Sequence, residues 1–271
     1  MRIVFFGSDD FAAVCLKELL KSSHQVMACV TKPDTRQGRG MQMTLSPIKE
    51  IALAQDISCL QPESFKEESV IKSLRVLAAD IFVVVAYGKI LPQVILDIPK
   101  IICVNIHGSL LPKYRGAAPI NWAILNGEEQ TGVTIMKMNA QMDAGDIISQ
   151  QIIPLSSEVT SDVLRQQMAL AGGQLLVKTL NQIATGKFAS ISQDESKVSF
   201  AAKLTKEMGR INWEKSAVAI ERMIRGLKPW PGTYCSFKNK TLKILQASIV
   251  EAKGDPSSIL EIRKEGFVVA C

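Results

Sequence analysis

Residues 1–20, MRIVFFGSDDFAAVCLKELL, set the fold class of this chain. Arg2–Phe6 is an apolar run typical of a buried strand, and Phe11–Leu20 has the apolar periodicity of a helix. The same pattern predicts four further strands and two further helices, at 26–30, 57–60, 81–85, 101–106, 46–55 and 67–77. Strands that alternate with helices predict an α/β fold with a parallel, doubly wound sheet. The turn after the first strand holds the single glycine Gly7, so the three-glycine pattern of a dinucleotide site is missing and NAD binding is unsupported.

The second half of the chain changes character after a long helix. We expect a pair of strands at 131–138 and 147–154, followed by a helix from Ser161 to about Gly186. The polar, aperiodic stretch Ser190–Phe200 is typical of a linker. A helix at 216–225 and short strands at 233–237, 241–247 and 266–270 indicate a small β-rich domain. The predicted division is a catalytic domain at 1–189, a linker at 190–205 and a second domain at 206–271.

The composition excludes several protein classes. With 47% hydrophobic and 21% charged residues, the chain is neither disordered nor collagen-like nor a coiled coil. No apolar stretch reaches the ~18 residues of a membrane span, and the N-terminus lacks the features of a signal peptide. The six cysteines form no CxxC pair, which predicts reduced thiols, no structural metal and a cytoplasmic location.

The net charge of +6 is unevenly distributed. Residues 1–202 hold 19 basic and 19 acidic side chains, whereas residues 203–271 hold 13 basic and 7 acidic ones. A basic C-terminal module suggests contact with a polyanion such as nucleic acid, because Lys and Arg displace phosphate counterions. A solvated basic surface without a ligand is the alternative.

The most informative residues lie at the end of the strand expected at 101–106. Residues two apart share a strand face, so Asn105 and His107 lie on one face while Val104 and Ile106 are buried on the other. Ligands bind at the carboxyl ends of strands in an open parallel sheet. An amide beside an imidazole that titrates near neutrality suits a developing oxyanion. A histidine bonded only to backbone is the alternative.

A carboxylate that could orient His107 and accept a proton is predicted in the turn Asp143-Ala144-Gly145-Asp146. Asp143 is the first choice and Asp146 the alternative, because spacing alone places neither beside the histidine. Aspartate is also common in such turns for conformational reasons alone.

Two basic loops are candidates for binding phosphate. Residues 32–40 carry three cations against one acid, and residues 113–116 directly follow the strand that ends in His107. For each loop, a solvated surface without a ligand is the alternative.

At these residues the sequence resembles the folate-dependent formyltransferase family. Asn105-Ile106-His107 is followed by SLLPKYRGAAPINWAILNG at 109–127 and TGVTIMKMNAQMDAGDI at 131–147. The stretches RQGRG at 36–40, AYGKILP at 86–92 and RGLKPWPGTY at 225–234 are similar to the branch of that family that acts on methionyl-tRNA. The resemblance extends from Met1 almost to the end of the chain.

The resemblance implies a Rossmann-like domain with a central, mostly parallel sheet, followed by a small OB-like β-barrel. It implies formyl transfer from 10-formyltetrahydrofolate to the methionine amino group of initiator methionyl-tRNA. This chemistry needs no metal, and we expect a monomer. The implied catalytic residues are Asn105, His107 and Asp143. The residues implied for the folate site are Ser109, Leu110, Leu111, Pro112, Tyr87 and Gly88. The residues implied for tRNA contact are Lys32, Arg36 and Arg39, together with the basic C-terminal domain.

Three departures from the family pattern and two other functions stand beside this hypothesis. The first turn is Gly7-Ser8-Asp9 where the family has a Gly-Thr-Pro-like turn, and Met142 precedes Asp143 where leucine is usual. Family members continue past the position of Cys271, so we expect an incomplete barrel. A sugar-nucleotide or glycinamide ribonucleotide formyltransferase would use the same three catalytic residues. A nucleic-acid-binding module without turnover would bind tRNA but transfer no formyl group.

Overall fold

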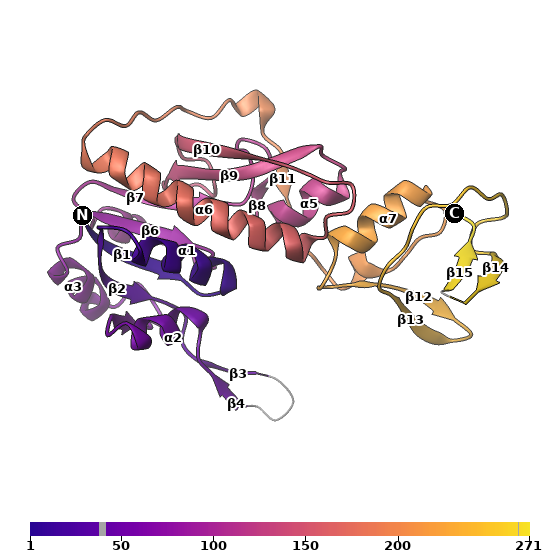
Figure 1. Cartoon of the computed structure of the whole chain (residues 1–271). Helices are drawn as coiled ribbons and strands as arrows, with labels where there is room; N and C mark the ends of the chain where they lie inside the picture. The colour runs from indigo at the N-terminus through magenta and orange to yellow at the C-terminus, as the bar shows by residue number, and fades with distance from the viewer. Residues whose placement is uncertain (38–41, 265) are drawn as a thin grey trace. The chain divides into compact units, whose positions relative to one another are not determined.

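The computed structural model describes residues 1–37, 42–264 and 266–271 (Figure 1). Its backbone contacts divide the chain into two units. The first unit comprises Met1–Arg115, Gly132–Ile153 and Gln166–Ser199, and the second comprises Gly116–Thr131, Pro154–Arg165 and Phe200–Cys271. The chain therefore passes between the units several times, and the residues Ser190–Ser199, expected to be a linker, pack with the first unit.

A sheet of seven strands, counted over the described residues, organises the first unit in the order β10-β9-β7-β6-β1-β2-β5. These strands are β1 (Arg2–Gly7), β2 (Gln25–Val30), β5 (Ser58–Leu60), β6 (Ile81–Val85), β7 (Ile102–His107), β9 (Gln130–Lys137) and β10 (Ile147–Pro154). The pairs β1–β2, β1–β6, β2–β5 and β6–β7 are parallel, whereas β7 pairs antiparallel with β9. The mostly parallel sheet confirms the predicted fold class.

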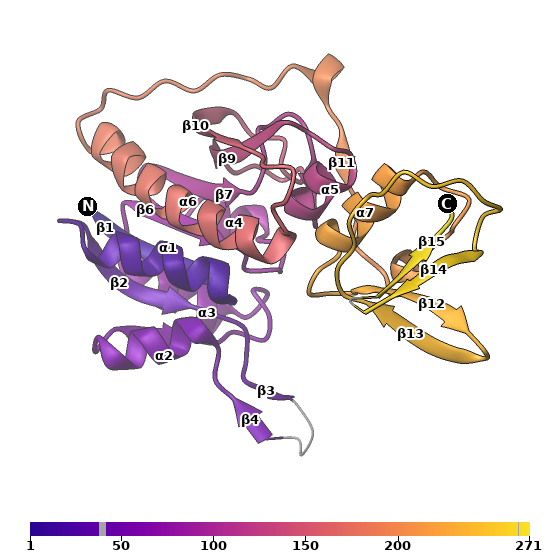
Figure 2. The same ribbon diagram turned by 45° about the vertical axis from the view of Figure 1, so that its right-hand side comes forward.

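Helices cover both faces of this sheet. On one face α1 (Asp10–Leu20) lies beside α6 (Ser161–Ala184), as Figures 1 and 2 show, and the Cys15 thiol donates to the Ala169 carbonyl at 3.3 Å. A further helix, α2 (Pro47–Ala54), packs against α1 and β2. On the other face α3 (Glu68–Val76) and α4 (Gln93–Leu96) contribute to a buried cluster that includes Phe6, Phe82 and Tyr87. Burial of apolar side chains on both faces stabilises the sheet.

Side-chain caps start three of the helices where the sequence indicates. The Asp9 carboxylate accepts from the Ala12 amide at 3.1 Å and begins α1. The Ser46 hydroxyl accepts from the Lys49 amide at 3.1 Å and begins α2, with Pro47 in the first turn as expected. Ser216 caps α7 (Ala217–Gly226) in the same way.

The second unit combines helices with short antiparallel strands. Here α5 (Pro119–Leu125) packs against α7 around a buried cluster that includes Ile211 and Leu227. The strands β12 (Thr233–Phe237) and β13 (Lys240–Ile244) form one hairpin, and β14 (Ile259–Arg263) and β15 (Gly266–Val269) form another. The small β-rich domain is therefore confirmed. Within the described residues its strands form two separate two-stranded sheets.

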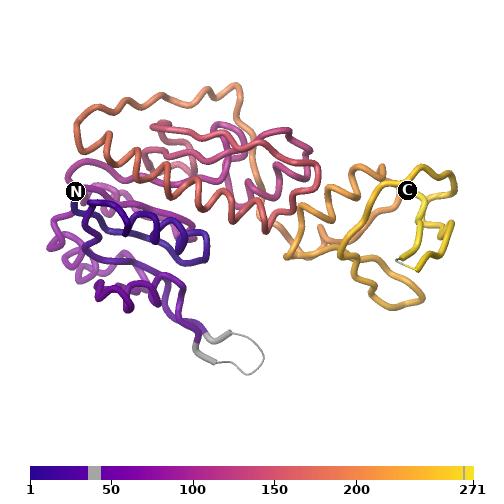
Figure 3. Tube along the Cα trace, viewed as in Figure 1, coloured from indigo at the N-terminus to yellow at the C-terminus, as the bar shows by residue number. Residues whose placement is uncertain are grey.

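Several shorter elements complete the chain. They are β3 (Thr35–Gln37), β4 (Gln42–Thr44), β8 (Arg115–Gly116), β11 (Phe200–Ala201) and the 3₁₀ turns η1 (Glu195–Lys197) and η2 (Glu207–Gly209). The backbone trace shows β3 and β4 side by side beyond the end of β2 (Figure 3). No helix in the ranges that the structure describes is long and apolar enough to cross a membrane.

Candidate active site

His107 is the last residue of β7, at the edge of the sheet where ligands of parallel α/β folds bind. Its side chain is buried, and its Nε2 lies 2.9 Å from the carbonyl oxygen of Tyr114. A carbonyl can only accept, so Nε2 carries a proton and donates it. This hydrogen bond orients the ring and leaves Nδ1 to face the other groups of the site.

Asp143 is the carboxylate that faces this nitrogen. Its Oδ1 lies 3.6 Å from Nδ1 of His107. That distance makes an ion pair when the imidazole is protonated, and it is longer than a good hydrogen bond. An acceptor therefore lies near each ring nitrogen, the Tyr114 carbonyl near Nε2 and the Asp143 carboxylate near Nδ1.

The alternative carboxylate, Asp146, is engaged elsewhere. Its two oxygens accept from the hydroxyls of Ser190 at 3.3 Å and Ser192 at 3.1 Å. The structure therefore brings Asp143, and not Asp146, to His107. The sequence could not decide between the two, because both lie in one short turn and the deciding partners are more than 40 residues away.

The turn that carries Asp143 has a constrained backbone. Asp143 has φ 53°, in the left-handed region that aspartate tolerates better than most residues. A Cβ at Gly145 would collide with the backbone carbonyl of Lys137, so only glycine fits at that position. These two residues explain why the turn has its Asp-x-Gly sequence.

Asn105 shares the pleat of His107 on β7 and is half-buried. Its carboxamide has no hydrogen-bond partner in the part of the chain that the structure describes. An unoccupied amide donor on the same strand face as a histidine can serve an oxygen that gains negative charge in a reaction. The structure thus places all three predicted catalytic residues at one end of β7.

The loop Ser109–Pro112, predicted to line a ligand site, follows directly after this strand. Ser109 is fully buried, and its hydroxyl donates to the Lys113 carbonyl at 2.6 Å. Leu111 is also buried, whereas Leu110 and Pro112 are partly exposed, and Leu110 packs over Gly132. The loop therefore presents Leu110 and Pro112, together with backbone, and not the serine hydroxyl.

Thr134 and Gln150 hold this loop, and the sequence-based reasoning missed both. The buried Thr134 hydroxyl donates to the Ser109 carbonyl at 2.6 Å and accepts from the Leu111 amide at 3.2 Å. The Gln150 Nε2 donates to the Thr134 hydroxyl and to the Leu111 carbonyl, each at 2.9 Å. A threonine inside the apolar run of β9 was the signal in the sequence, since a buried hydroxyl needs partners.

The loop at 86–92, predicted to lie near the folate, has its tyrosine side chain in the core. The Tyr87 ring is buried, with its centroid 5.7 Å from that of Phe6 and 6.0 Å from that of Phe65. Burial raises the pKa of its phenol to about 12. Gly88 has φ 70°, and the ammonium group of Lys32 lies against it. A ligand at this loop can therefore meet backbone and Lys32, but not the Tyr87 ring.

The predicted tRNA-contacting loop begins in the hairpin of β3 and β4, where Arg36 pairs with Met43. Arg39 lies outside the described residues. The base of the hairpin is held by a cluster that the sequence did not reveal. The Lys49 ammonium lies 2.5 Å from the Asp34 carboxylate, and the Gln61 amide donates to Asp34 at 2.8 Å. These hydrogen bonds, first that from Lys49, lower the pKa of Asp34.

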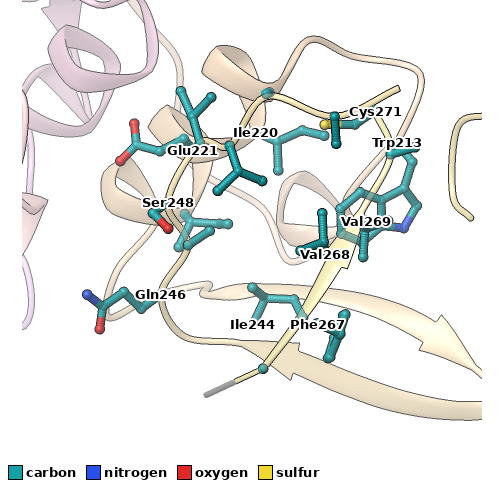
Figure 4. Close-up of a pocket in the computed structure, with 18 of the residues that line it drawn as sticks. Trp213, Ile220, Glu221, Ile244, Gln246, Ser248, Phe267, Val268, Val269 and Cys271 are labelled. Carbon is teal, nitrogen blue, oxygen red and sulfur yellow. The ribbon is translucent and has the colours of Figure 1, made fainter. Parts of the chain in front are cut away.

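The second unit holds a cavity of different character. A space of about 560 Å³ lies between α7, β13 and β15 and is lined mainly by apolar side chains that include Trp213, Ile220 and Phe267 (Figure 4). Over the described residues no group of three or more His, Cys, Asp or Glu side chains is arranged to hold a metal ion.

Comparison with known families covers nearly the whole chain. Residues 1–180 match the family described as formyl transferase, and residues 203–271 match the formyl transferase C-terminal domain. A curated methionyl-tRNA formyltransferase of Caldanaerobacter subterraneus subsp. tengcongensis is 44% identical over 274 residues, which cover 100% of this chain and 88% of the relative. Relatives of the same name from Acetivibrio thermocellus and Geobacter sulfurreducens are 42% and 40% identical, covering 100% of this chain and 88% and 86% of theirs.

Solved structures share the fold at lower identity. WlaRD, a sugar 3N-formyl transferase crystallised with dTDP and 5-N-formyl-THF, matches with a TM-score of 0.73 at 20% identity, over 100% of this chain and 93% of its own. HypX from Aquifex aeolicus in complex with tetrahydrofolic acid matches with a TM-score of 0.71 at 18% identity, over 100% of this chain and 42% of its own. At these identities the likeness concerns the fold alone.

Proposed function

This chain belongs to the formyl transferase family, and we propose that it formylates the methionine amino group of initiator methionyl-tRNA, with 10-formyltetrahydrofolate as the formyl donor. The product is formylmethionyl-tRNA for translation initiation. Relatives named for this activity are 40–44% identical over the whole chain. The observation that carries the proposal is the approach of Asp143 Oδ1 to within 3.6 Å of Nδ1 of His107. His107 lies on β7, the strand that also presents Asn105.

The donor set fits a formyl group. A formyl oxygen that becomes negatively charged needs donors, and Asn105 offers a carboxamide without a partner among the described residues. His107 offers Nδ1 once it is protonated, since Nε2 is already committed to Tyr114. The loop 109–112 and the backbone at 86–88 would hold the folate beside them.

The proposed reaction needs no covalent enzyme intermediate. The free amino group of methionine forms a bond to the formyl carbon, and the resulting oxyanion accepts hydrogen bonds from Asn105 and His107. Asp143 pairs with protonated His107 and accepts the proton lost by the attacking amine, directly or through water. The bond from the formyl carbon to the folate nitrogen then breaks, and that nitrogen receives the proton. Each charge-assisted contact of this kind is worth about 3 kcal/mol of transition-state stabilisation.

The acceptor is the part of the proposal that the catalytic residues do not decide. A sugar-nucleotide or glycinamide ribonucleotide formyltransferase would use the same three residues. Residues 203–271 hold 13 basic and 7 acidic side chains, and this basic excess favours a polyanionic acceptor such as tRNA. We place Arg36, Arg39 and Lys32 at the tRNA as part of the proposal.

The decisive experiment incubates the chain with 10-formyltetrahydrofolate and methionine-charged initiator tRNA and measures formylmethionine after deacylation. We expect transfer by the parent and none by His107→Ala, with tRNA affinity nearly unchanged in the variant. Near-normal turnover by His107→Ala would overturn the mechanism. A parent that binds tRNA but transfers no formyl group would be a binding module instead. Arg36→Ala and Arg39→Ala should weaken use of tRNA and flatten its salt dependence.

We further propose that the chain acts as a monomer. A role in translation initiation supports a cytoplasmic location. Sedimentation equilibrium at working concentration tests the monomer, and a dimer that persists on dilution would contradict it.

A further inference from the structure

We propose that the segment Ser190–Ser199, called the strap below, is part of the catalytic apparatus, and that Gln193 is a positioning residue that holds the Asp143 turn against His107. The inference rests on the proposed function for its kinetic readout. It assigns a role to residues whose sequence is typical of a linker, and its geometry lies entirely within the first unit.

Gln193 makes three hydrogen bonds that lock its amide between two parts of the site. Its Nε2 donates to the carbonyl of Asp143 at 2.8 Å and to the carbonyl of Gly145 at 2.7 Å. Its Oε1 accepts from Nε of Arg115 at 3.0 Å. Both amide hydrogens thus bind the turn that carries the carboxylate, and the amide oxygen is held by a guanidinium.

Arg115 holds the amide oxygen of Gln193, on the side away from the Asp143 turn. It is 5% exposed, and its guanidinium also pairs with both oxygens of Glu195, with the shorter contact of 2.8 Å from Nη2 to Oε1. A buried arginine with paired donors is rigid, because its planar group can satisfy these contacts in one orientation only. The chain of contacts therefore runs from Glu195 through Arg115 and Gln193 to the Asp143 turn.

The strap also reaches the other side of the His107–Asp143 pair. The Ser199 hydroxyl accepts from the Tyr114 amide at 2.9 Å, and the Ser199 carbonyl accepts from the Arg115 amide at 2.9 Å. Tyr114 in turn supplies the carbonyl that orients Nε2 of His107. One segment thus fixes the backbone that orients the imidazole and the backbone that presents the carboxylate.

The backbone of the Asp143 turn has a conformation that needs support from its neighbours. A left-handed φ at a non-glycine residue costs roughly 1–2 kcal/mol and persists only where neighbours over-determine it. Asp143 has such a φ, 53°. The strap runs along the outer edge of the sheet next to β10 in both views, and Ile191 pairs with Ile147 through two backbone hydrogen bonds of 2.9 and 2.8 Å (Figures 1 and 2). This pairing places Gln193 over the turn.

Two substitutions separate positioning from simple packing. Gln193→Glu keeps the length of the side chain and the acceptor toward Arg115 but loses both donors to the turn. Gln193→Met keeps the length and loses all three bonds. Ser196→Ala is the matched control in the same segment, because among the described residues the Ser196 hydroxyl bonds only to the neighbouring Asp194.

We expect kcat for formyl transfer to fall about 10- to 100-fold in both Gln193 variants, because small displacements of catalytic groups cost rates of this size. KM for tRNA and for the folate should change less than threefold, and Ser196→Ala should match the parent. A structural role through Arg115 predicts instead that Gln193→Glu behaves like the parent, and that result would overturn the proposal.

Hydrogen exchange of the peptide covering 139–146 supplies a readout that does not depend on the reaction. Its amides should exchange faster in both Gln193 variants than in the parent and in Ser196→Ala. If exchange at 139–146 is unchanged in the Gln193 variants, the proposed role of the strap is wrong, whether or not the chain transfers formyl groups. A parent without formyl transfer overturns the proposed function alone, and the exchange result then decides the role of Gln193 in holding the turn.

Discussion

Replacing the Asp143 carboxylate by an amide tests the centre of the proposed site. Asp143→Asn retains the shape of the side chain and removes its charge. Two unit charges about 4 Å apart interact by about 4 kcal/mol at an effective dielectric constant of about 20. The Nδ1–Oδ1 distance is 3.6 Å, and the two side chains are only 6% and 16% exposed, so screening by water is limited. Because a tenfold change in rate corresponds to about 1.4 kcal/mol, we expect kcat to fall by about 10²- to 10³-fold.

The assay is single-turnover formyl transfer to methionyl-tRNA with enzyme in excess, so that slow variants remain measurable. Asp146→Asn is the matched control, since it lies three residues away, carries the same charge and bonds to serine hydroxyls that an amide oxygen can still partly serve. It should stay within a few-fold of the parent. A larger loss for Asp146→Asn than for Asp143→Asn, or a rate for Asp143→Asn above a third of the parent's, would refute this assignment of the carboxylate.

Thr134→Val keeps the shape of a buried side chain but leaves the partners of its hydroxyl unpaired, so we expect a loss of about 1–3 kcal/mol in unfolding free energy and a higher KM for folate. Denaturant unfolding measures the first, and a midpoint equal to the parent's contradicts it. Burial raises the pKa of the Cys29 and Cys103 thiols to about 12, so iodoacetamide at pH 8 should label the exposed Cys271 and leave both buried thiols intact, as peptide mass spectrometry would show. Asp34 has a lowered pKa, so its charge contributes stability that is present above about pH 4 and is lost as the pH falls through the lower pKa of the folded state. The difference in Tm between the parent and Asp34→Asn should therefore shrink below about pH 4, and a constant difference would contradict this.

The sheet could be predicted because its signals are local. The apolar run at 81–85 became β6 with the same bounds, and the strand expected at 147–154 became β10. The Ser46-Pro47 pair started α2 as its cap chemistry requires. Where the sequence signals were weak, elements were missed. Every residue of β14 at 259–263 is exposed, and its sequence lacks the alternation that marks a half-buried strand.

The candidate site was predictable only in part, because its groups meet through long-range contacts. Asn105 and His107 lie two residues apart on one strand, and the period of a strand is enough to put them on one face. The choice of Asp143 depends on contacts between segments 36 residues apart, and no local pattern encodes that distance. Tyr87 shows what a motif leaves open, since the residue stays predicted for the folate site while its ring lies in the hydrophobic core.

The strap explains why a polar, aperiodic sequence can be essential to a buried site. Its side chains bind backbone and carboxylate groups at the edge of the sheet, so they need hydrogen-bonding atoms and have no reason to repeat with a helical or strand period. Ser190 and Ser192 bind the carboxylate of Asp146, whereas Gln193 binds the carbonyl of Asp143 and leaves its carboxylate directed at His107. Hydrogen bonds from the strap thus engage the carboxylate of Asp146 and leave that of Asp143 facing His107, although the two side chains are chemically identical. Loss of the Gln193 amide donors should therefore alter catalysis without altering any residue that touches substrate.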